Sequence, residues 1–371
     1  MFFDFSSSIL DIINSNDEFQ KNELLKVLYN ATDSIIKRRH YISCENFDVA
    51  EQIYNFCRER DKKNEANLFF HIYEKLSMIA CVKDELKFYI CIGNFEKDIE
   101  INGNHISVNY KLAKNEFFFD RPFFIPEDLL DKKYFDAICK HEQLHIHNST
   151  LKTLNYDFRK DHGGGGKTYD LFIERINEGS PILVILDSDK KTPTSSFGGT
   201  ADKFLADDVN KKLENYFFLI LNVHEMENLY SSEYFLKKSG YARKSYEKLR
   251  HFDSVDTDAR LYFDIKMGYN YKEYLNNDYI KSLYGEFDKS SLCEKDCNNC
   301  NLKKCKVTVL QGKTHYLEHL FTNINNTGDI ENEINKGYSG LIAKIKDEWK
   351  KIFIYMITVG CFYDESITGV N

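Results

Sequence analysis

Two aspartates stand directly after an apolar run near the middle of the chain. The run covers residues 181–186 (PILVIL), and Asp187, Ser188 and Asp189 follow it. An apolar run of this length between polar residues is typical of a strand buried on both faces of an α/β sheet. Crowded carboxylates repel one another unless a cation or a proton lies between them. The pair therefore predicts a divalent-metal site in which oxygen atoms bind Mg²⁺ or Mn²⁺.

A second apolar run, residues 216–223, ends in an acidic segment that contains Glu225 and Glu227. In open parallel sheets the carboxyl ends of the strands meet at one edge, and ligands bind there. Glu225 or Glu227 is expected to complete the metal shell or to act as base on a bound water. We count both as catalytic candidates, and Glu227 joins Asp187 and Asp189 as a candidate metal ligand. The alternative is a capped turn with solvated carboxylates.

Glycines occupy positions 163–166, ahead of the first run, and Lys167 follows them. The first glycine of a P-loop would fall at Asp161, and no apolar strand precedes it, so a Walker-type ATP site is rejected. Backbone N–H groups of glycines before a helix can still bind a phosphate. Gly165, Gly166 and Lys167 are therefore the candidate phosphate-binding residues, with a flexible loop as the alternative.

Four cysteines lie close together in one polar segment: Cys293, Cys297, Cys300 and Cys305. Four thiolates at this spacing suit a closed tetrahedral Zn²⁺ site with a structural role, and an iron–sulfur cluster is the second choice. The first residues carry neither the basic start nor the apolar core of an export signal, so reduced thiols and a cytoplasmic protein are expected. Residues 352–360 form an apolar run that is too short to span a bilayer, so no membrane partner is expected.

His141, Glu142 and His145 match a zinc-peptidase motif, in which two histidines four residues apart share a helix face and the glutamate polarises water. The alternation of apolar and polar residues over 144–147 favours a strand instead. No third ligand follows at a near spacing. A zinc peptidase is therefore kept as a minor alternative.

The chain has 371 residues, which indicates two or three domains. Its net charge of −8 argues against a strongly basic coat for nucleic acid, although bound cations can supply the missing attraction. We expect an α/β fold with a mostly parallel sheet and helical flanks. The expected units are a helical region at 1–82, an α/β or β-hairpin insertion at 83–135, the α/β core at 136–230, and a mainly helical region with the cysteine cluster at 231–371.

The arrangement around Asp187 resembles the TOPRIM domain. The shared features are an apolar strand ending in Asp-Ser-Asp, a glycine-rich loop before it and an acidic, Asn-containing strand end after it, over about residues 160–230. More narrowly, it is similar to the TOPRIM nucleases of the OLD family and of related bacterial anti-phage effectors. The resemblance implies a TOPRIM or Rossmann-like sheet and a Mg²⁺- or Mn²⁺-dependent endonuclease in which Asp187 and Asp189 bind the metal, joined by Glu225 or Glu227.

That family also has a glutamate at the end of its first strand, within an acidic-Gly motif. Glu45 is the best candidate for this glutamate, because an amphipathic helix follows it, although Asn46 stands where the family has glycine. Glu142 is the fallback. By the resemblance, Glu45 would act as general base or as a further ligand. The ATPase motifs of an OLD protein are absent from the sequence, so any ATPase would be a separate subunit.

The sequence therefore predicts a nuclease that acts on DNA, with RNA or tRNA as the second choice, and by analogy an effector of anti-phage defence. The expected partners are nucleic acid and a separate ATPase or sensor subunit, and a homo-oligomer is left open. The alternative from another class is a binding or sensor module, whose degenerate acidic site recognises a nucleotide or a partner protein.

Overall fold

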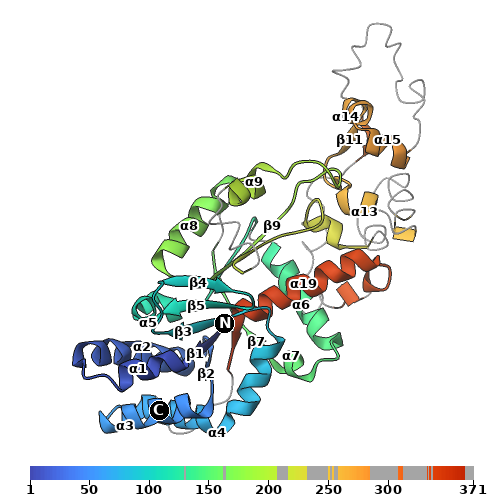
Figure 1. Cartoon of the computed structure of the whole chain (residues 1–371). Helices are drawn as coiled ribbons and strands as arrows, with labels where there is room; N and C mark the ends of the chain where they lie inside the picture. The colour runs from blue at the N-terminus through green and yellow to red at the C-terminus, as the bar shows by residue number, and fades with distance from the viewer. Residues whose placement is uncertain are drawn as a thin grey trace, which may run out of the picture.

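The computed structural model describes most of the chain. The described residues are 1–128, 131–161, 164–206, 216–231, 250, 253–254, 258–284, 308–311, 332, 334–335 and 337–363. They form a mixed α/β fold with mostly parallel sheets and helices packed against them (Figure 1). The four cysteines of the predicted zinc site, at positions 293–305, lie outside the described residues, so that site stays a prediction.

The first sheet is built from the N-terminal third of the chain. Its described strands are β1 (Phe2–Phe5), β2 (Tyr41–Cys44), β3 (Tyr89–Gly93), β4 (Ile99–Asn102) and β5 (His105–Asn109), in the order β2-β1-β3-β5-β4. The β4–β5 pair is antiparallel and the other described pairs are parallel. Gly103 has a φ of 63° in the turn between β4 and β5, which confirms the predicted hairpin. The hairpin extends the sheet that begins at β1, so the region expected as an insertion at 83–135 supplies β3, β4 and β5 of this sheet.

Helices cover this first sheet: α1 (Leu10–Ile13), α2 (Glu18–Ile36), α3 (Phe47–Glu59), α4 (Lys63–Glu85) and α5 (Tyr110–Ala113). Asp17 caps α2, because its carboxylate accepts hydrogen bonds from the first backbone N–H groups of the helix, and Asn46 caps α3 in the same way. The region 1–82 was expected to be helical. It also contributes β1 and β2, two short buried strands that helical periodicity does not reveal.

The second sheet carries the strand that the Asp-Ser-Asp segment follows. Its described strands are β6 (Phe123–Pro126), β8 (Arg159–Lys160), β9 (Ile182–Leu186) and β10 (Phe218–Ile220), in the order β10-β9-β6-β8, and the pairs are parallel. Every residue of β9 and β10 is buried, which confirms the two buried strands expected from the apolar runs. The sheet begins at β6, well before residue 136, where the core was expected to start.

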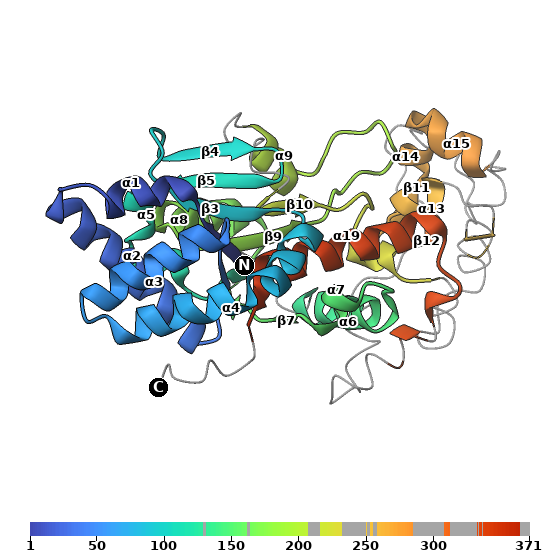
Figure 2. The ribbon, with the colours of Figure 1, turned by 60° about the horizontal axis from the view of Figure 1, so that its bottom comes forward.

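The second sheet packs against α6 (Asp131–His145), α8 (Thr168–Glu178), α9 (Gly199–Ala206) and α19 (Ala343–Gly360). Helices α6 and α19 lie side by side in both views (Figures 1 and 2). Trp349 of α19 is buried and donates a hydrogen bond from Nε1 to the backbone oxygen of Leu229, 2.9 Å away. The alternation at 144–147 had favoured a strand, but α6 runs through residue 145, so that expectation is wrong.

The remaining described elements are short. They are the 3-10 helices η1 (Ser7–Ile9), η2 (Glu116–Phe119), η3 (Gly165–Lys167) and η4 (Met226–Leu229), the helices α7 (Ser149–Thr153), α13 (Asp258–Tyr262), α14 (Tyr271–Asn276) and α15 (Asp278–Tyr284), and the strands β7 (Asn155–Tyr156), β11 (Gly268–Asn270), β12 (Thr308–Gln311) and β13 (Cys361–Phe362). None of the helices in the described part of the chain is long and apolar enough to cross a membrane.

Candidate metal centre

The carboxyl ends of β6 and β9 bring two acidic residues next to each other. Pro126 of β6 is paired with Ile185 of β9 in a parallel register. Glu127 is the next residue along β6, and Asp187 follows one residue after its partner in β9. Parallel strands end at the same edge of a sheet, so both carboxylates lie at the edge where α/β folds bind ligands.

The segment after β9 is hydrogen-bonded to the segment after β10. Ser188 donates a hydrogen bond from Oγ to the backbone oxygen of Val223 at 2.5 Å, and the backbone N–H of Asp189 donates to the oxygen of His224 at 2.8 Å. Asp189 has a φ of 54°, in the left-handed region, and its side chain is exposed at the same edge. Gly198 lies directly against that side chain, since a Cβ on Gly198 would stand 1.9 Å from Asp189 Oδ2.

The electrostatics join these three carboxyl groups into one cluster. Burial raises the pKa of Glu127, and the negative charge of Asp189 raises it further, while hydrogen bonds from the Thr200 side chain and the Asp187 backbone lower it. Burial also raises the pKa of Asp187 well above its usual range, and the charges of Glu127 and Asp131 add to the effect. Carboxyl groups that raise one another's pKa in this way attract a cation.

Asp131, the first residue of α6, belongs to the same cluster. Burial raises its pKa to about 7, and the charge of Glu227 contributes, while a hydrogen bond from the backbone of Asp128 opposes the shift. The N-terminus of α6 therefore places the carboxyl group of Asp131 near the strand edge. The partial positive charge of a helix N-terminus favours an acidic residue at this position.

Glu225 and Glu227 are buried and share one ammonium group. Lys266 Nζ lies 3.2 Å from Glu225 Oε2 and 3.0 Å from Glu227 Oε2, and the backbone N–H of Lys266 donates to Glu225 Oε1 at 3.0 Å. Burial together with the charge of Glu227 raises the pKa of Glu225 to about 7. Burial lowers the pKa of Lys266, but the two glutamates and Asp187 outweigh it and raise the pKa, so the ammonium group stays charged.

His224, Glu225 and Asp264 form a further group, with one candidate ligand atom from each lying within 4.8 Å of the others. The side chains of His224 and Asp264 already have hydrogen-bond or ion-pair partners within the protein. His224 donates from Nδ1 to the backbone oxygen of Lys190 at 3.0 Å, while Asp264 Oδ2 lies 3.6 Å from His224 Nε2 and 3.3 Å from Lys191 Nζ. These contacts therefore connect the segment after β10 to the loop that carries Asp189 and help to hold that loop in place.

The predicted phosphate loop lies beside the cluster. The backbone N–H of Gly165 donates to the oxygen of Glu127 at 3.4 Å, and Lys203 of α9 donates to the oxygen of Gly166 at 3.1 Å. Gly164 and Gly165 have φ values of 62° and 63°, which glycine adopts without strain. Lys167 ends η3, directly before α8. The glycine segment thus reaches the strand edge, as a phosphate-binding loop would require.

Glu45, expected from the resemblance to be the first acidic residue, does not join the cluster. It follows β2 in the other sheet, where its Oε2 accepts hydrogen bonds from the backbone N–H of Ser7 at 2.7 Å and from Ser6 Oγ at 3.3 Å. Those hydrogen bonds lower its pKa, with the backbone of Ser7 the largest cause. Glu45 therefore lies in the other sheet from Asp187, and the strand-end glutamate beside Asp187 is Glu127.

The fallback Glu142 and the zinc-peptidase residues lie on α6, away from the strand edge. His141 and His145 stack with ring centroids 4.3 Å apart, but His141 also packs at a tilted angle against Tyr338, at 4.1 Å, and contacts Trp349 edge-on, at 5.5 Å. His145 uses Nδ1 to donate to the backbone oxygen of His141 at 2.8 Å. Among the described residues these side chains do not form a metal-ligand group, and His141 packs as a core histidine.

Sequence reasoning missed Glu127, Asp131 and Lys266. The signal for Glu127 was present, because the apolar residues 123–126 end in Glu127 and Asp128 just as 181–186 end in Asp187. The run is short and contains a proline, which weakens a strand assignment. Lys266 had no sequence signal, since a turn brings it back to the cluster from beyond α13.

Comparison with protein-family models, with curated proteins and with solved structures finds no match to this chain. Any function proposed for it therefore rests on the geometry and chemistry of the strand edge.

Proposed function

We propose that this chain is a divalent-metal-dependent phosphodiesterase that cuts nucleic acid, with DNA as the first substrate to test and RNA, including tRNA, as the second. The observation that carries the proposal is the pairing of Glu127 and Asp187 at the ends of adjacent parallel strands, with Asp189 two residues further on. Carboxylate oxygens are the ligands that Mg²⁺ and Mn²⁺ prefer, and an ion would draw these three side chains closer together, since their ligand atoms do not all lie within 4.8 Å of one another.

The donor set fits a divalent cation. Burial and neighbouring carboxylates raise the pKa values of Glu127 and Asp187, so a bound cation would relieve both effects. In addition, Glu227 Oε2 is buried and lies 3.0 Å from the Lys266 ammonium group. Glu127, Asp187 and Asp189 would hold the ion, and Glu227 lies close enough to contribute to the raised pKa of Asp187.

A bound Mg²⁺ or Mn²⁺ supplies charge stabilisation at the phosphate and an acidic bound water. The chain's own groups supply the rest. The backbone N–H of Gly165 already donates to Glu127, so the exposed Gly166 and Lys167 are the residues of this loop that would bind a phosphate of the substrate. Glu225, with a pKa of about 7, is suited to accept or release a proton near neutral pH.

The resemblance to the TOPRIM nucleases, which rests on the same Asp-Ser-Asp segment, agrees with this proposal. That family has a glutamate at the end of its first strand, and Glu127, which follows β6 beside the Asp-Ser-Asp strand, is our candidate for this role. With Glu127 in place of Glu45, the acidic residues all come from one sheet. A role in anti-phage defence, alone or with a separate ATPase or sensor subunit, is part of the proposal by analogy.

The test is cleavage of supercoiled plasmid DNA and of total tRNA by the purified chain in Mg²⁺, in Mn²⁺ and in EDTA. The variants are Glu127→Gln and Asp187→Asn, with Glu45→Gln as the matched control, because Glu45 ends a strand of the other sheet. We expect metal-dependent cutting by the wild type and by Glu45→Gln, and a loss of at least about 10³-fold in the two site variants, since they remove metal ligands.

Two results would contradict the proposal. The first is cutting by Glu127→Gln or Asp187→Asn at the wild-type rate, which would assign the activity to a contaminant or to another site. The second is the absence of cutting together with the absence of Mn²⁺ binding in calorimetry. Mn²⁺ binding without cutting would instead favour the sensor alternative, in which the acidic edge recognises a ligand without hydrolysing it.

A further inference from the structure

Helices α3 and α4 form a pair whose outer side carries aromatic rings. Phe47 of α3 contacts Tyr73 of α4 with ring centroids 5.5 Å apart, and Tyr54 contacts Phe70 at the same distance. Because the earlier residue of α3 meets the later residue of α4, the two helices run antiparallel, side by side (Figures 1 and 2). These four residues are referred to as the aromatic face.

The aromatic face is open to solvent. Phe47 is 48% exposed, Phe70 is 46% exposed and Tyr73 is 37% exposed, while Tyr54 is half-buried. The opposite side of each helix is buried, so these rings are not needed to fill the core of the first sheet. Apolar side chains that lie together on the surface of a protein mark an interaction site.

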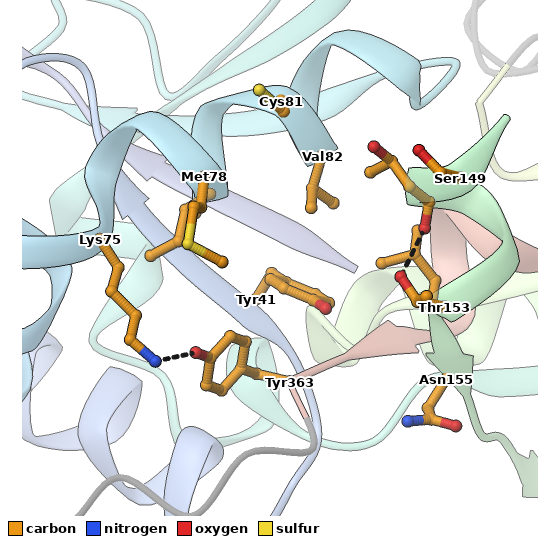
Figure 3. A pocket seen from close by; sticks show the side chains of 12 residues that line it. Tyr41, Lys75, Met78, Cys81, Val82, Ser149, Thr153, Asn155 and Tyr363 are labelled. Atoms are coloured by element: carbon orange, nitrogen blue, oxygen red, sulfur yellow. Dashed lines mark hydrogen bonds between the residues drawn. The ribbon is translucent and has the colours of Figure 1, made fainter.

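The aromatic face ends before the last turns of α4. Met78 and Val82 point toward Tyr41 there and line a separate cavity of about 450 Å³ (Figure 3). The interaction surface therefore covers α3 and the first half of α4. Since α3 has 13 residues, this surface is about 20 Å long at a rise of about 1.5 Å per residue.

Along α3, the interaction surface changes from negative to positive. Glu51 lies three residues before Tyr54 and Arg58 lies four residues after it, so both charges share the side of the helix that carries the ring. Both residues are exposed. The Arg58 guanidinium lies 5.3 Å from the centre of the Tyr54 ring, which places its positive charge at the edge of the aromatic face.

Along α4, the order of the charges is reversed, because this helix runs the other way. Lys63 lies seven residues before Phe70, at the turn between the helices, and Glu74 lies four residues after Phe70. Both residues are exposed. Arg58 and Lys63 therefore form a positive end of the surface, and Glu51 and Glu74 form a negative end.

The surrounding sequence has the same polarity. Residues 58–63 contain four basic and two acidic side chains, whereas residues 45–57 contain three acidic and no basic ones. Such a surface is complementary to itself, because a twofold axis through its centre places the positive end of one copy on the negative end of the other. A parallel arrangement of the two copies would instead place like charges opposite each other.

We propose that the aromatic face docks on the same face of a second copy of this chain, about a twofold axis that sets α3 and α4 of one copy antiparallel to those of the other. The product is a four-helix arrangement with the rings at its centre and ion pairs between the copies at both ends. The charges select the antiparallel orientation, and burial of the rings stabilises it. This inference is independent of the proposed nuclease activity and is tested without it.

The experiment is sedimentation velocity on the full chain across a concentration series, in low and in high salt. We expect a monomer–dimer equilibrium with a dissociation constant of about 10 μM or below. Association should be weaker in high salt, since salt screens the charges between the copies.

Two variants test the aromatic face. Phe70→Ser removes one of its rings, and Ile99→Ser is the control, because Ile99 is an exposed apolar residue of β4, at the opposite edge of the first sheet from β2. We expect Phe70→Ser to weaken dimerisation by at least about tenfold, and Ile99→Ser to associate like the wild type. Thermal unfolding checks that each variant is folded.

Charge reversal gives a second test that leaves the rings in place. Arg58→Glu makes the α3 side of the surface negative at both ends, and Glu51→Arg makes it positive at both ends. Each variant alone should therefore dimerise at least about tenfold more weakly than the wild type. A mixture of the two should form a heterodimer, because opposite charges then face each other, and a purely structural role of either residue would not restore association on mixing.

Three results would each overturn the proposal. They are a wild-type chain that remains monomeric at about 100 μM, wild-type association of Phe70→Ser, and a mixture of the two charge variants that associates no more tightly than either variant alone. If Phe70→Ser does not fold, the mixing test decides, because it alters only exposed charges.

Discussion

Replacing Gly198 by alanine should disable the metal centre without unfolding the protein. A Cβ at Gly198 would stand 1.9 Å from Oδ2 of Asp189, 2.6 Å from its Cγ and 2.5 Å from its Cβ. Rotation of the carboxylate cannot relieve the last contact, because the Cβ of Asp189 moves only with the backbone. That backbone is held by the hydrogen bond from Asp189 N to His224 O, 2.8 Å, and by the hydrogen bond from Gly198 N to Ser188 O, 2.9 Å.

The size of the effect follows from these distances. Real Cβ contacts stay at or above 3.0 Å, so Oδ2 of Asp189 must retreat by at least 1.1 Å from its position at 1.9 Å. A displacement of about 1 Å in a reacting group can cost about 10²-fold in rate. The fold should lose little, since the strain falls on a loop at the edge of the sheet and costs about the one hydrogen bond that breaks, ~1 kcal/mol.

Gly199→Ala is the control for this prediction. Gly199 is the next residue and begins α9, and a Cβ there meets nothing within 4 Å. Alanine at that position should leave the loop in place, because alanine is favoured over glycine in a helix. The pair therefore separates the position of Asp189 from a general effect of replacing glycine in this segment.

The assay is Mn²⁺ binding by calorimetry, followed by plasmid cleavage and by thermal unfolding for each variant. Gly198→Ala should bind Mn²⁺ about 10- to 100-fold more weakly than the wild type, as expected for a ligand forced out of place. Wild-type affinity in Gly198→Ala would refute the reasoning about Asp189. A wild-type chain that binds no Mn²⁺ would instead contradict the proposed function, so the two failures are distinguishable.

Three further predictions concern the charges at the edge. Asp187→Asn should abolish Mn²⁺ binding yet raise the unfolding temperature of the metal-free protein by a few degrees. Burial and neighbouring carboxylates raise the pKa of Asp187, which means that they disfavour its negative charge, and asparagine removes that charge. An unchanged or lower unfolding temperature would contradict this prediction. Glu225 and Asp131 have pKa values of about 7, above the value of about 4 expected in the unfolded chain, so the folded state holds more protons between these values. The contribution of these two groups to the stability of the metal-free protein should therefore be largest below about pH 4 and fall as the pH rises to about 8, and Mg²⁺ should reduce the fall. Unfolding in EDTA across this range, compared with Glu225→Gln, measures the fall, and an equal slope in the variant would contradict the prediction. Lys266→Met leaves Glu225 and Glu227 without the ammonium group between them and should destabilise the metal-free protein by about 1–3 kcal/mol, a range reduced because Lys266 is 39% exposed. Mn²⁺ should restore the lost stability. Urea unfolding with and without Mn²⁺ tests this prediction, and an equal loss of stability in both conditions would contradict it.

Several features of the fold could be predicted from local sequence. The apolar runs at 181–186 and 216–223 were expected to be buried strands, and β9 and β10 confirm them. A β-hairpin was expected within residues 83–135, and β4 and β5 confirm it, with Asn102 and Gly103 at the turn. These features succeed because burial on both faces and a positive φ each impose a residue type over a few adjacent positions.

The extent of the sheets could not be predicted in the same way. β1 and β6 are four residues long, and a short apolar run fits a strand, a buried turn or a helix segment equally well. The helix α6 was mistaken for a strand near residue 145, because its last turn carries alternating polar and apolar residues. In each case the partner that decides the structure lies far away along the chain.

The sequence by itself determined that Asp187 and Asp189 follow a buried strand, and that a second acidic segment follows another. The tertiary structure decided which glutamate joins them: the register of β6 against β9 brings in Glu127 and leaves Glu45 in the other sheet. It also decided that the Lys266 ammonium group lies beside the negative charge of Glu227. The physical reason is that a strand's ends are local properties of the chain, whereas the neighbours of a carboxylate depend on which strands pair and in what register.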